Sequence, residues 1–291
     1  MIWIEEQEQE EKEMNNDEKF AVRDSELPEF RQQLLERARH DLQQDPDVLA
    51  IYLAGSLAKW NADNYSDIDL HAIVKPEKLA SFIKDKKRRA EEWGNVLFFE
   101  GTAASPVIVS HFDCFVKVDS WYHSAEEIEP SIWLKGMNIL YDPNGILTPI
   151  QKASEIAVYE ITAGEVAFWR TKVLAFIHET YRAAMRGEAY CALANLDSVR
   201  WLIASGWYME KGQHFDGPYQ AWSKIEGDRS RLSGNQLQLL AAWEASREPR
   251  TILEALEGIS TEFTRLNKTL SKRVGLEDES EMVNKAIGLV L

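Results

Sequence analysis

The sequence contains few cysteines and no long apolar run, and both absences exclude classes of protein. Cys114 and Cys191 are its two cysteines, and neither belongs to a CxxC or Cys/His cluster. Two cysteines cannot build a disulfide framework, and without such clusters there is no sign of a zinc site. No stretch reaches the roughly 20 consecutive apolar residues of a membrane-spanning helix. Residues 1–20 also lack the basic start and apolar middle of a secretory signal. We therefore expect a cytoplasmic protein with no membrane partner.

Basic residues are also scarce, since 33 Lys and Arg stand against 48 Asp and Glu, for a formal net charge of −15. An acidic surface repels phosphate backbones, so we expect no nucleic-acid partner. Residues 1–19 carry eight acids and two lysines, a net of −6, and we interpret them as an acidic disordered tail. The hydrophobic fraction of 45% is ample for a folded core in the rest of the chain.

The hydrophobic pattern changes near residue 150 and predicts two domains. Before that point, helical patterns alternate with short apolar runs that are typical of buried strands, at 48–55, 67–74, 95–101, 106–118 and 139–142. After it, strand patterns disappear and helical patterns follow one another, at 163–186, 189–211, 216–226, 235–246, 250–273 and 278–289. The fold class predicted is an α/β (α+β) domain with a mixed sheet over 20–149, whose first helix spans 28–44, followed by an all-α helical-bundle domain over 150–291.

The candidate catalytic and ligand-binding residues lie where the first two predicted strands are connected. The first strand ends in Gly55-Ser56, and after a spacer of ten residues the second carries Asp67-Ile68-Asp69-Leu70. Residues two apart in a strand point to the same side, so Asp67 and Asp69 share one face. Two ionised carboxylates so placed repel each other unless a cation lies between them, and Mg²⁺ favours such oxygen ligands. Gly55 permits close approach of a phosphate and Ser56 adds a hydroxyl. This combination indicates phosphoryl or nucleotidyl transfer, whereas the alternative is a plain turn before an exposed strand edge.

The segment AGSLAKWNADNYSDIDL (54–70) resembles the signature of the nucleotidyltransferase superfamily whose fold is shared with DNA polymerase beta. The resemblance implies Mg²⁺ held by Asp67 and Asp69, and a nucleoside triphosphate, ATP, bound through Gly55 and Ser56. The family usually adds a third acid on a neighbouring strand, as a metal ligand or proton acceptor. Asp113 in SHFDCFV is the best match for that acid, and Asp119 and Glu100 are the alternatives.

The layout over residues 28–291 is similar to that of bacterial nucleotidyltransferases that act on aminoglycosides and lincosamides. That likeness implies transfer of AMP from ATP to a hydroxyl of a small-molecule acceptor, with antibiotic resistance as the corresponding role, by a monomer or a homodimer. In those relatives an acid of the helical domain often serves as the base. Here Glu165 is the candidate for this catalytic base, with Glu188 as a second possibility.

Two other functions stay open at this point. An antitoxin-like nucleotidyltransferase would modify a protein side chain, and a degenerate member of the superfamily would only bind its ligand. The helical domain argues against the protein modifier because it offers a built-in acceptor pocket. The acids Asp67, Asp69 and Asp113 argue against the degenerate binder, since all three are present.

Overall fold

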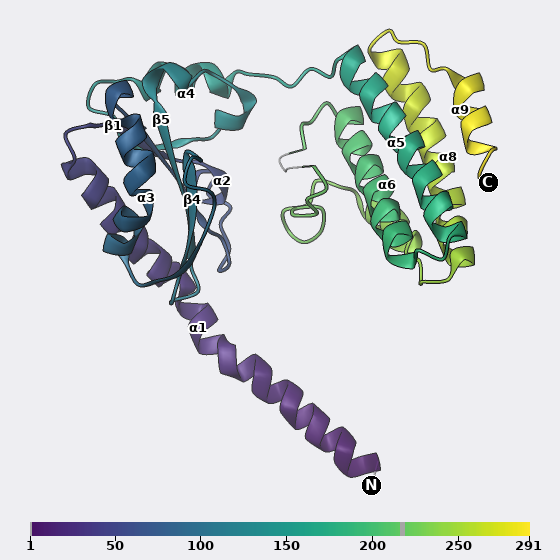
Figure 1. Ribbon diagram of the computed structural model, residues 1–291, viewed down its shortest axis with the longest axis horizontal. Helices are drawn as coiled ribbons and strands as arrows, with labels where there is room; N and C mark the ends of the chain where they lie inside the picture. The colour runs from purple at the N-terminus through teal and green to yellow at the C-terminus, as the bar shows by residue number, and fades with distance from the viewer. Residues whose placement is uncertain (1, 216–218) are drawn as a thin grey trace. The chain divides into compact units, whose positions relative to one another are not determined.

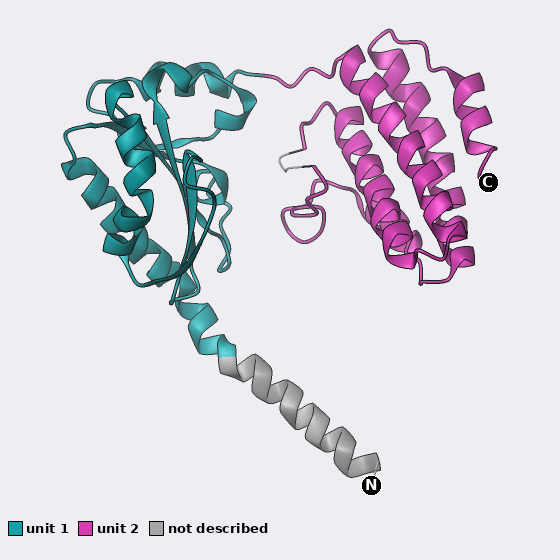
Figure 2. Cartoon of the chain, viewed as in Figure 1, with its two compact units in different colours: residues 1–157 teal, residues 158–291 magenta. Residues whose placement is uncertain are grey.

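The computed structural model describes residues 20–215 and 219–291 together with their side chains. The acidic disordered tail expected at 1–19 lies outside the described residues and stays a prediction. The chain divides into two compact units, residues 1–157 and residues 158–291 (Figure 2). This division falls beyond the expected boundary at 149/150 because an additional helix, α4 (Leu147–Glu155), buries Leu147 against the sheet of the first unit.

Within the described residues, the first unit is built on a mixed six-stranded sheet of order β3-β4-β5-β2-β1-β6, which confirms the predicted fold class. Strands β2 and β5 run parallel, and the other neighbouring strands run antiparallel. In chain order the strands are β1 (Val48–Leu53), β2 (Ile68–Val74), β3 (Val96–Glu100), β4 (Val107–Phe112), β5 (Lys117–Ser124) and β6 (Asn138–Tyr141).

Two helices, α1 (Ile2–Gln44) and α3 (Leu79–Trp93), pack against one face of this sheet (Figure 1). The even-numbered side chains of β2 and β5, such as Leu70 and Tyr122, are buried beneath them. Helix α1 includes residues 20–27, which precede the predicted start at Pro28, because Leu27 is itself part of this core at 2% exposure. The odd-numbered side chains of β2 and β5 therefore point to the opposite face.

The run 106–118, expected to form strand, is in fact a hairpin in which β4 and β5 are joined by residues 113–116. Phe115 adopts a left-handed backbone conformation with φ 65°, and its N–H donates to the carbonyl of Phe112 at 3.0 Å. No glycine or proline marks the reversal. Asp113 is the one residue of this turn that is typical of turns, so the sequence signals the change of direction only weakly.

The second unit is all-helical, as predicted. Its helices are α5 (Ala163–Met185), α6 (Ala189–Glu210), α7 (Gly234–Ala242), α8 (Pro249–Arg273) and α9 (Ser280–Ile287). Helices α5, α6 and α8 pack side by side (Figure 1) around Trp169, Trp207 and Phe263. The helix expected at 216–226 is absent over its described part, 219–226, where turns replace it. Among the described residues, no helix is both long enough and apolar enough to cross a membrane.

Candidate active site

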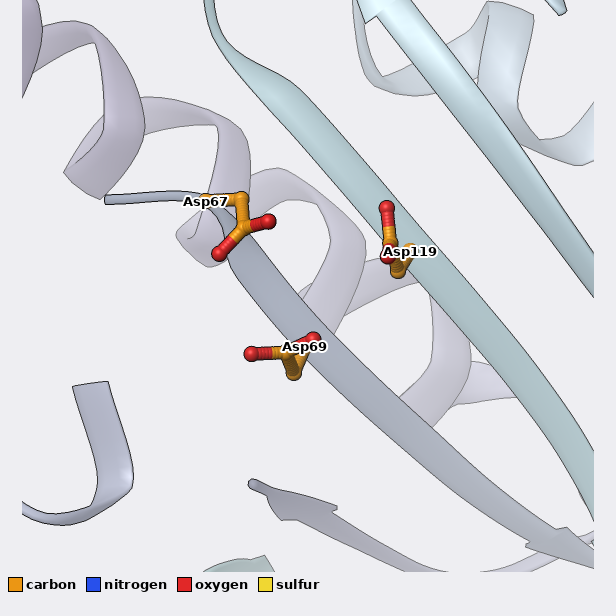
Figure 3. A group of neighbouring side chains, drawn as sticks. All are labelled: Asp67, Asp69 and Asp119. Atoms are coloured by element: carbon orange, nitrogen blue, oxygen red, sulfur yellow. The ribbon is translucent and has the colours of Figure 1, made fainter. Parts of the chain in front are cut away.

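Three carboxylates meet on the sheet face that points away from α1 and α3. Asp67 directly precedes β2, Asp69 lies within β2, and Asp119 lies in the neighbouring strand β5 (Figure 3). The parallel register pairs Asp69 with Asp119. Each of the three offers a carboxylate oxygen, and these oxygens all lie within 4.8 Å of one another. The structure thus brings Asp67 and Asp69 together and adds Asp119 to them.

The third carboxylate of this group is Asp119, which corrects the expectation for Asp113. Asp113 lies in the turn between β4 and β5, where its carboxylate accepts a hydrogen bond from Asn95 Nδ2 at 2.9 Å. It lines a separate pocket with Phe30 and Leu34 of α1, on the side of the sheet that faces the helices. The other alternative, Glu100, instead contacts His111 Nε2 at 2.6 Å.

A sequence signal for Asp119 exists in the alternation of its strand. Lys117 and Asp119 alternate with Val118, and Tyr122 continues the apolar positions, although the polar Ser120 interrupts the pattern. Such a period of two is typical of a strand with one buried face. The hairpin turn at 113–116 hid this signal, because a single strand over 106–118 gives no reason to start a new alternation at residue 117.

Gly55 makes room for the carboxylate of Asp69. Its backbone has φ +64°, and a Cβ at this position would lie 1.8 Å from Asp69 Oδ2. The N–H of Ala54 donates to the backbone carbonyl of Asp69 at 3.0 Å, which holds the end of β1 against β2. Ser56 follows in the short helix α2 (Gly55–Ala58) and is 7% exposed. The structure therefore places the Gly-Ser pair directly beside the carboxylates.

A lysine lies among the three acids. Lys117 Nζ is 2.7 Å from Asp67 Oδ2 and 3.2 Å from Asp119 Oδ1. Burial acts to lower the pKa of Lys117, but the hydrogen bond that its ammonium group donates to Asp67 and the negative charges of Asp119 and Asp67 outweigh burial and raise the pKa. For Asp119, burial raises the pKa and the charge of Lys117 opposes that rise. The site therefore holds a charged ammonium group within a cluster of negative charge.

The segment that leads into Asp67 is held by Arg31 of α1. Arg31 Nη1 donates to the carbonyls of Asp63, Asn64 and Ser66 at 3.0, 3.1 and 2.9 Å. The arginine is 8% exposed, so these hydrogen bonds are largely sheltered from water. One buried side chain therefore fixes three carbonyls of the four residues before Asp67.

Next to the carboxylates, the same sheet face carries a stack of rings. His71 stacks on Tyr52 and on Trp121, with ring centroids 4.5 and 5.8 Å apart. His71 Nδ1 and His123 Nε2 lie 3.0 Å apart. Burial, with a smaller contribution from His123, lowers the pKa of His71 to about 3. Neutral imidazole rings thus form the floor beside the acidic group.

Glu165 belongs to the second unit, where it completes a capping box at the start of α5. Its carboxylate accepts hydrogen bonds from the N–H and the hydroxyl of Thr162, both at 2.8 Å, and from the hydroxyl of Tyr159 at 3.3 Å. These contacts give Glu165 a structural role in the helix start. The catalytic role expected for Glu165 stays a prediction.

No protein-family model matches the sequence, and the comparison with curated proteins also finds no match. Solved structures that are similar to the chain include the following two. An aminoglycoside 6-adenyltransferase from Bacillus subtilis is 13% identical with a TM-score of 0.41, covering 89% of this chain and 97% of its own. A nucleotidyltransferase-like protein from Exiguobacterium sibiricum is 14% identical with a TM-score of 0.42, covering 81% of this chain and 75% of its own. Both TM-scores are below 0.5, so the site's own geometry has to support any function.

Proposed function

We propose that the chain is a nucleotidyltransferase that moves a nucleoside monophosphate from a magnesium–nucleotide complex to a hydroxyl group. One observation carries this proposal: the oxygens of Asp67, Asp69 and Asp119 converge within 4.8 Å of one another beside a glycine. Carboxylates at this spacing repel each other strongly unless a cation compensates them. Lys117 pairs with Asp67 and Asp119, but one positive charge leaves an excess of negative charge on the three carboxylates.

The donor set fits Mg²⁺. All three side chains offer hard oxygen atoms, which this ion prefers. Asp119 Oδ1 is buried and accepts no hydrogen bond, although Lys117 Nζ lies 3.2 Å from it. A buried carboxylate oxygen in this state is suited to a cation. Bound there, Mg²⁺ would orient the phosphates and compensate the charge that develops on them.

The surrounding residues would position the nucleotide. Ser56 directly follows Gly55 in the short helix α2, where its hydroxyl would bind a phosphate beside the carboxylates. Lys117 supplies a positive charge on the other side of Asp67. Positioning of this kind accounts for much of the catalysis in phosphoryl transfer. We propose that either Asp119 or Glu165 accepts the proton of the attacking hydroxyl. Asp119 replaces Asp113, the residue expected from the sequence.

The motif resemblance extends the proposal to ATP as the donor and to a small molecule as the acceptor, with AMP as the group transferred. The test combines α-labelled ATP and Mg²⁺ with a panel of aminoglycosides, lincosamides and proteins. We expect label on a small molecule, and we expect Asp69→Ala to abolish transfer while Asp85→Ala, on the exposed side of α3, retains it. Undiminished transfer by Asp69→Ala would overturn the proposal. Label on protein alone would favour the antitoxin-like alternative.

Glu165 can be tested without disturbing its helix cap. Glutamine also completes a capping box, so Glu165→Gln keeps the start of α5 and removes the proton-accepting group. If Glu165 is the base, turnover falls sharply while the melting temperature is unchanged. Unchanged turnover would leave Asp119 as the proton acceptor.

A further inference from the structure

A pocket of about 380 Å³ opens directly beside the cluster of Asp67, Asp69 and Asp119. Asp67 itself and Lys117, which pairs with it, both line this pocket. Pockets of this size are typical of small-molecule sites. Apart from those two charged residues, it is lined mainly by apolar and aromatic side chains from β3, β4, the β4–β5 turn, α1 and the segment before β2, which also adds the polar Asn64 and Ser66. An apolar pocket that continues from a charged site suggests a ligand with two chemically different ends.

One wall of the pocket is a pair of rings on β3 and β4. The rings of Phe98 and His111 are stacked, with centroids 4.1 Å apart and an interplanar angle of 15°. The register between β3 and β4 shifts between Val96 and Phe98, which exposes both Leu97 and Phe98. The shift therefore places two successive apolar side chains at the pocket, where regular alternation would place one.

The β4–β5 turn contributes Phe115 to the pocket lining. This side chain is 61% exposed although its backbone is left-handed with φ 65°, a conformation that is costly for an aromatic residue and that glycine would adopt freely. The guanidinium of Arg23 lies 4.1 Å from the ring centroid. Arg23 also pairs with Asp24 at 2.6 Å, and Asp24 accepts a hydrogen bond from Tyr65, another lining residue, at 2.9 Å. An exposed ring held in a strained turn and supported from behind indicates a binding role.

The pocket lies on the side from which an acceptor must approach. Nucleotidyl transfer proceeds in line, so the attacking oxygen and the leaving pyrophosphate lie on opposite sides of the α-phosphorus. Gly55 and Ser56 follow β1, on one side of β2, whereas the pocket lies toward β5, β4 and β3, on the other side. With the leaving phosphates at Gly55 and Ser56, the acceptor enters from the pocket.

We infer that this pocket binds the acceptor, and that the acceptor carries an apolar, aromatic ring next to its hydroxyl rather than several ammonium groups. The inference rests on the proposed transfer reaction. Asp67 is the one acidic residue among those that line the pocket, and its carboxylate is already paired with Lys117. A polycation would find no second carboxylate on the pocket wall, whereas a flat ring would contact Phe98 and Phe115.

The bond changes at this site balance. The acceptor oxygen forms a bond to the α-phosphorus as the bond from that phosphorus to the bridging oxygen of pyrophosphate breaks. Pyrophosphate leaves with the bonding electron pair. The proton of the acceptor hydroxyl passes to the carboxylate of the proposed base, either Asp119 in β5, next to β4 of the pocket, or Glu165. The products are the nucleotide ester of the acceptor and pyrophosphate.

The binding test uses 2-naphthalenemethanol as an aromatic alcohol and kanamycin as a polycation, with ligand-observed NMR on the full chain. We expect naphthalenemethanol to bind, and Phe98→Ala or Phe115→Gly to weaken that binding about tenfold, the usual effect of losing one ring contact. Phe168→Ala, an equally exposed phenylalanine in the second unit (61%), is the matched control and retains binding. Phe115→Gly also keeps or raises the melting temperature, because glycine tolerates the left-handed turn. Equal binding by all variants would overturn the inference, and so would displacement of the probe by kanamycin.

Kinetics separate this inference from the proposed reaction. With naphthalenemethanol as acceptor, we expect the pocket variants to raise the KM for the acceptor and to leave the KM for ATP unchanged. A raised KM for ATP would assign the pocket to the nucleobase and overturn the inference. If the probe binds through Phe98 and Phe115 but no acceptor receives label, the proposed reaction fails and the pocket stands. If kanamycin receives label equally from the wild type and the pocket variants, the proposed reaction stands and the inference about the pocket fails.

Discussion

At the scale of single residues, the space beside Asp69 depends on one missing Cβ. Gly55→Ala would place a methyl group 1.8 Å from Asp69 Oδ2, so the carboxylate or the end of β1 has to move. A displacement of about 1 Å at a reacting centre can reduce the rate about 100-fold. We therefore expect Gly55→Ala to lower kcat/KM for transfer by about that factor, measured with labelled ATP and any acceptor the wild type uses.

The matched control is Gly145→Ala. Gly145 has nearly the same backbone conformation, φ +67°, but a Cβ there meets no atom within 4 Å. Gly145→Ala therefore reports the cost of the left-handed backbone alone. Equal losses of activity in the two variants would contradict the role given to the contact between Gly55 and Asp69.

His71 makes the stability of the first unit depend on pH. Burial and His123 hold the pKa of His71 at about 3 in the folded state, whereas the unfolded chain binds this proton below about pH 6.5. The stabilisation is present above pH 6.5 and is lost as the pH falls toward 3. Between pH 7 and pH 5 the loss amounts to about 2 kcal/mol.

His71→Phe removes the titrating group and keeps a ring against Tyr52 and Trp121. We expect the free energy of unfolding of this variant to fall about 2 kcal/mol less than that of the wild type between pH 7 and pH 5. Chemical denaturation at the two pH values measures the difference. Parallel pH profiles for wild type and variant would contradict a neutral, buried His71.

The part of the site that sequence could predict is the part encoded by local spacing. Asp67 and Asp69 share one face because they are two residues apart in a strand, and the structure shows that arrangement. Asp119 depends on the pairing of β5 with β2, a contact between residues 50 positions apart. Local patterns carry no information on that pairing, and the turn at Phe115 carries no glycine or proline to reveal the second strand.

At the scale of elements, α1 positions the segment that carries Asp67. Arg31→Met would leave the carbonyls of Asp63, Asn64 and Ser66 without their shared donor. Loss of such buried hydrogen bonds costs about 1–3 kcal/mol. We expect the free energy of unfolding to fall by that amount and the Mg²⁺ concentration for half-maximal transfer to rise.

The control on the same helix is Arg37→Met, because Arg37 is exposed. It should change neither stability nor the Mg²⁺ requirement. Lower stability in Arg31→Met with an unchanged Mg²⁺ requirement would show that Arg31 supports the fold without positioning Asp67.

The long helices and the apolar strands bounded by turn residues were the predictable elements. The helices α5, α6 and α8 and the strands β1 and β2 lie within a few residues of their predicted bounds. The short helix α4 was missed because it follows directly on the turn after β6 and buries only Leu147 and Ser154. The helix expected at 216–226 is replaced by turns over its described part, where Gln220 and Lys224 have φ 65° and 66°.

At the scale of the whole molecule, the two units have separate hydrophobic cores. In the second core, Arg170 is buried and joins three helices. It donates to Asn267 at 2.8 Å and Ser271 at 3.0 Å, both in α8, and pairs with Glu279, just before α9, at 2.8 Å. One side chain therefore connects α5 to the last two helices.

Arg170→Met should lower the free energy of unfolding of the second unit by about 2–3 kcal/mol, since it leaves several buried acceptors without a donor. Arg182→Met, an exposed position on the same helix, is the control. Hydrogen exchange resolved by peptide shows where the loss falls. Faster exchange confined to 158–291 agrees with separate cores, and equal acceleration in the sheet of the first unit would contradict them.

Much of the net negative charge of the molecule lies in particular segments of the chain. Of the net charge of −15, the tail accounts for −6, and three further acids form the group at Asp67, Asp69 and Asp119. The pocket next to that group is lined mainly by apolar side chains, so the remaining negative charge of the molecule takes no direct part in acceptor binding. Net charge alone therefore could not identify the acceptor.

The most direct test of the proposed reaction compares Asp119→Asn with Asp113→Asn. Asp113 lies in the β4–β5 turn and Asp119 lies six positions later in β5, and of the two only Asp119 meets Asp67 and Asp69. The measurement is Mg²⁺-dependent release of pyrophosphate from ATP in the presence of an acceptor. We expect Asp119→Asn to lose release by at least about 100-fold and Asp113→Asn to retain it. Retained release in Asp119→Asn, or its loss in Asp113→Asn alone, would contradict the proposed site.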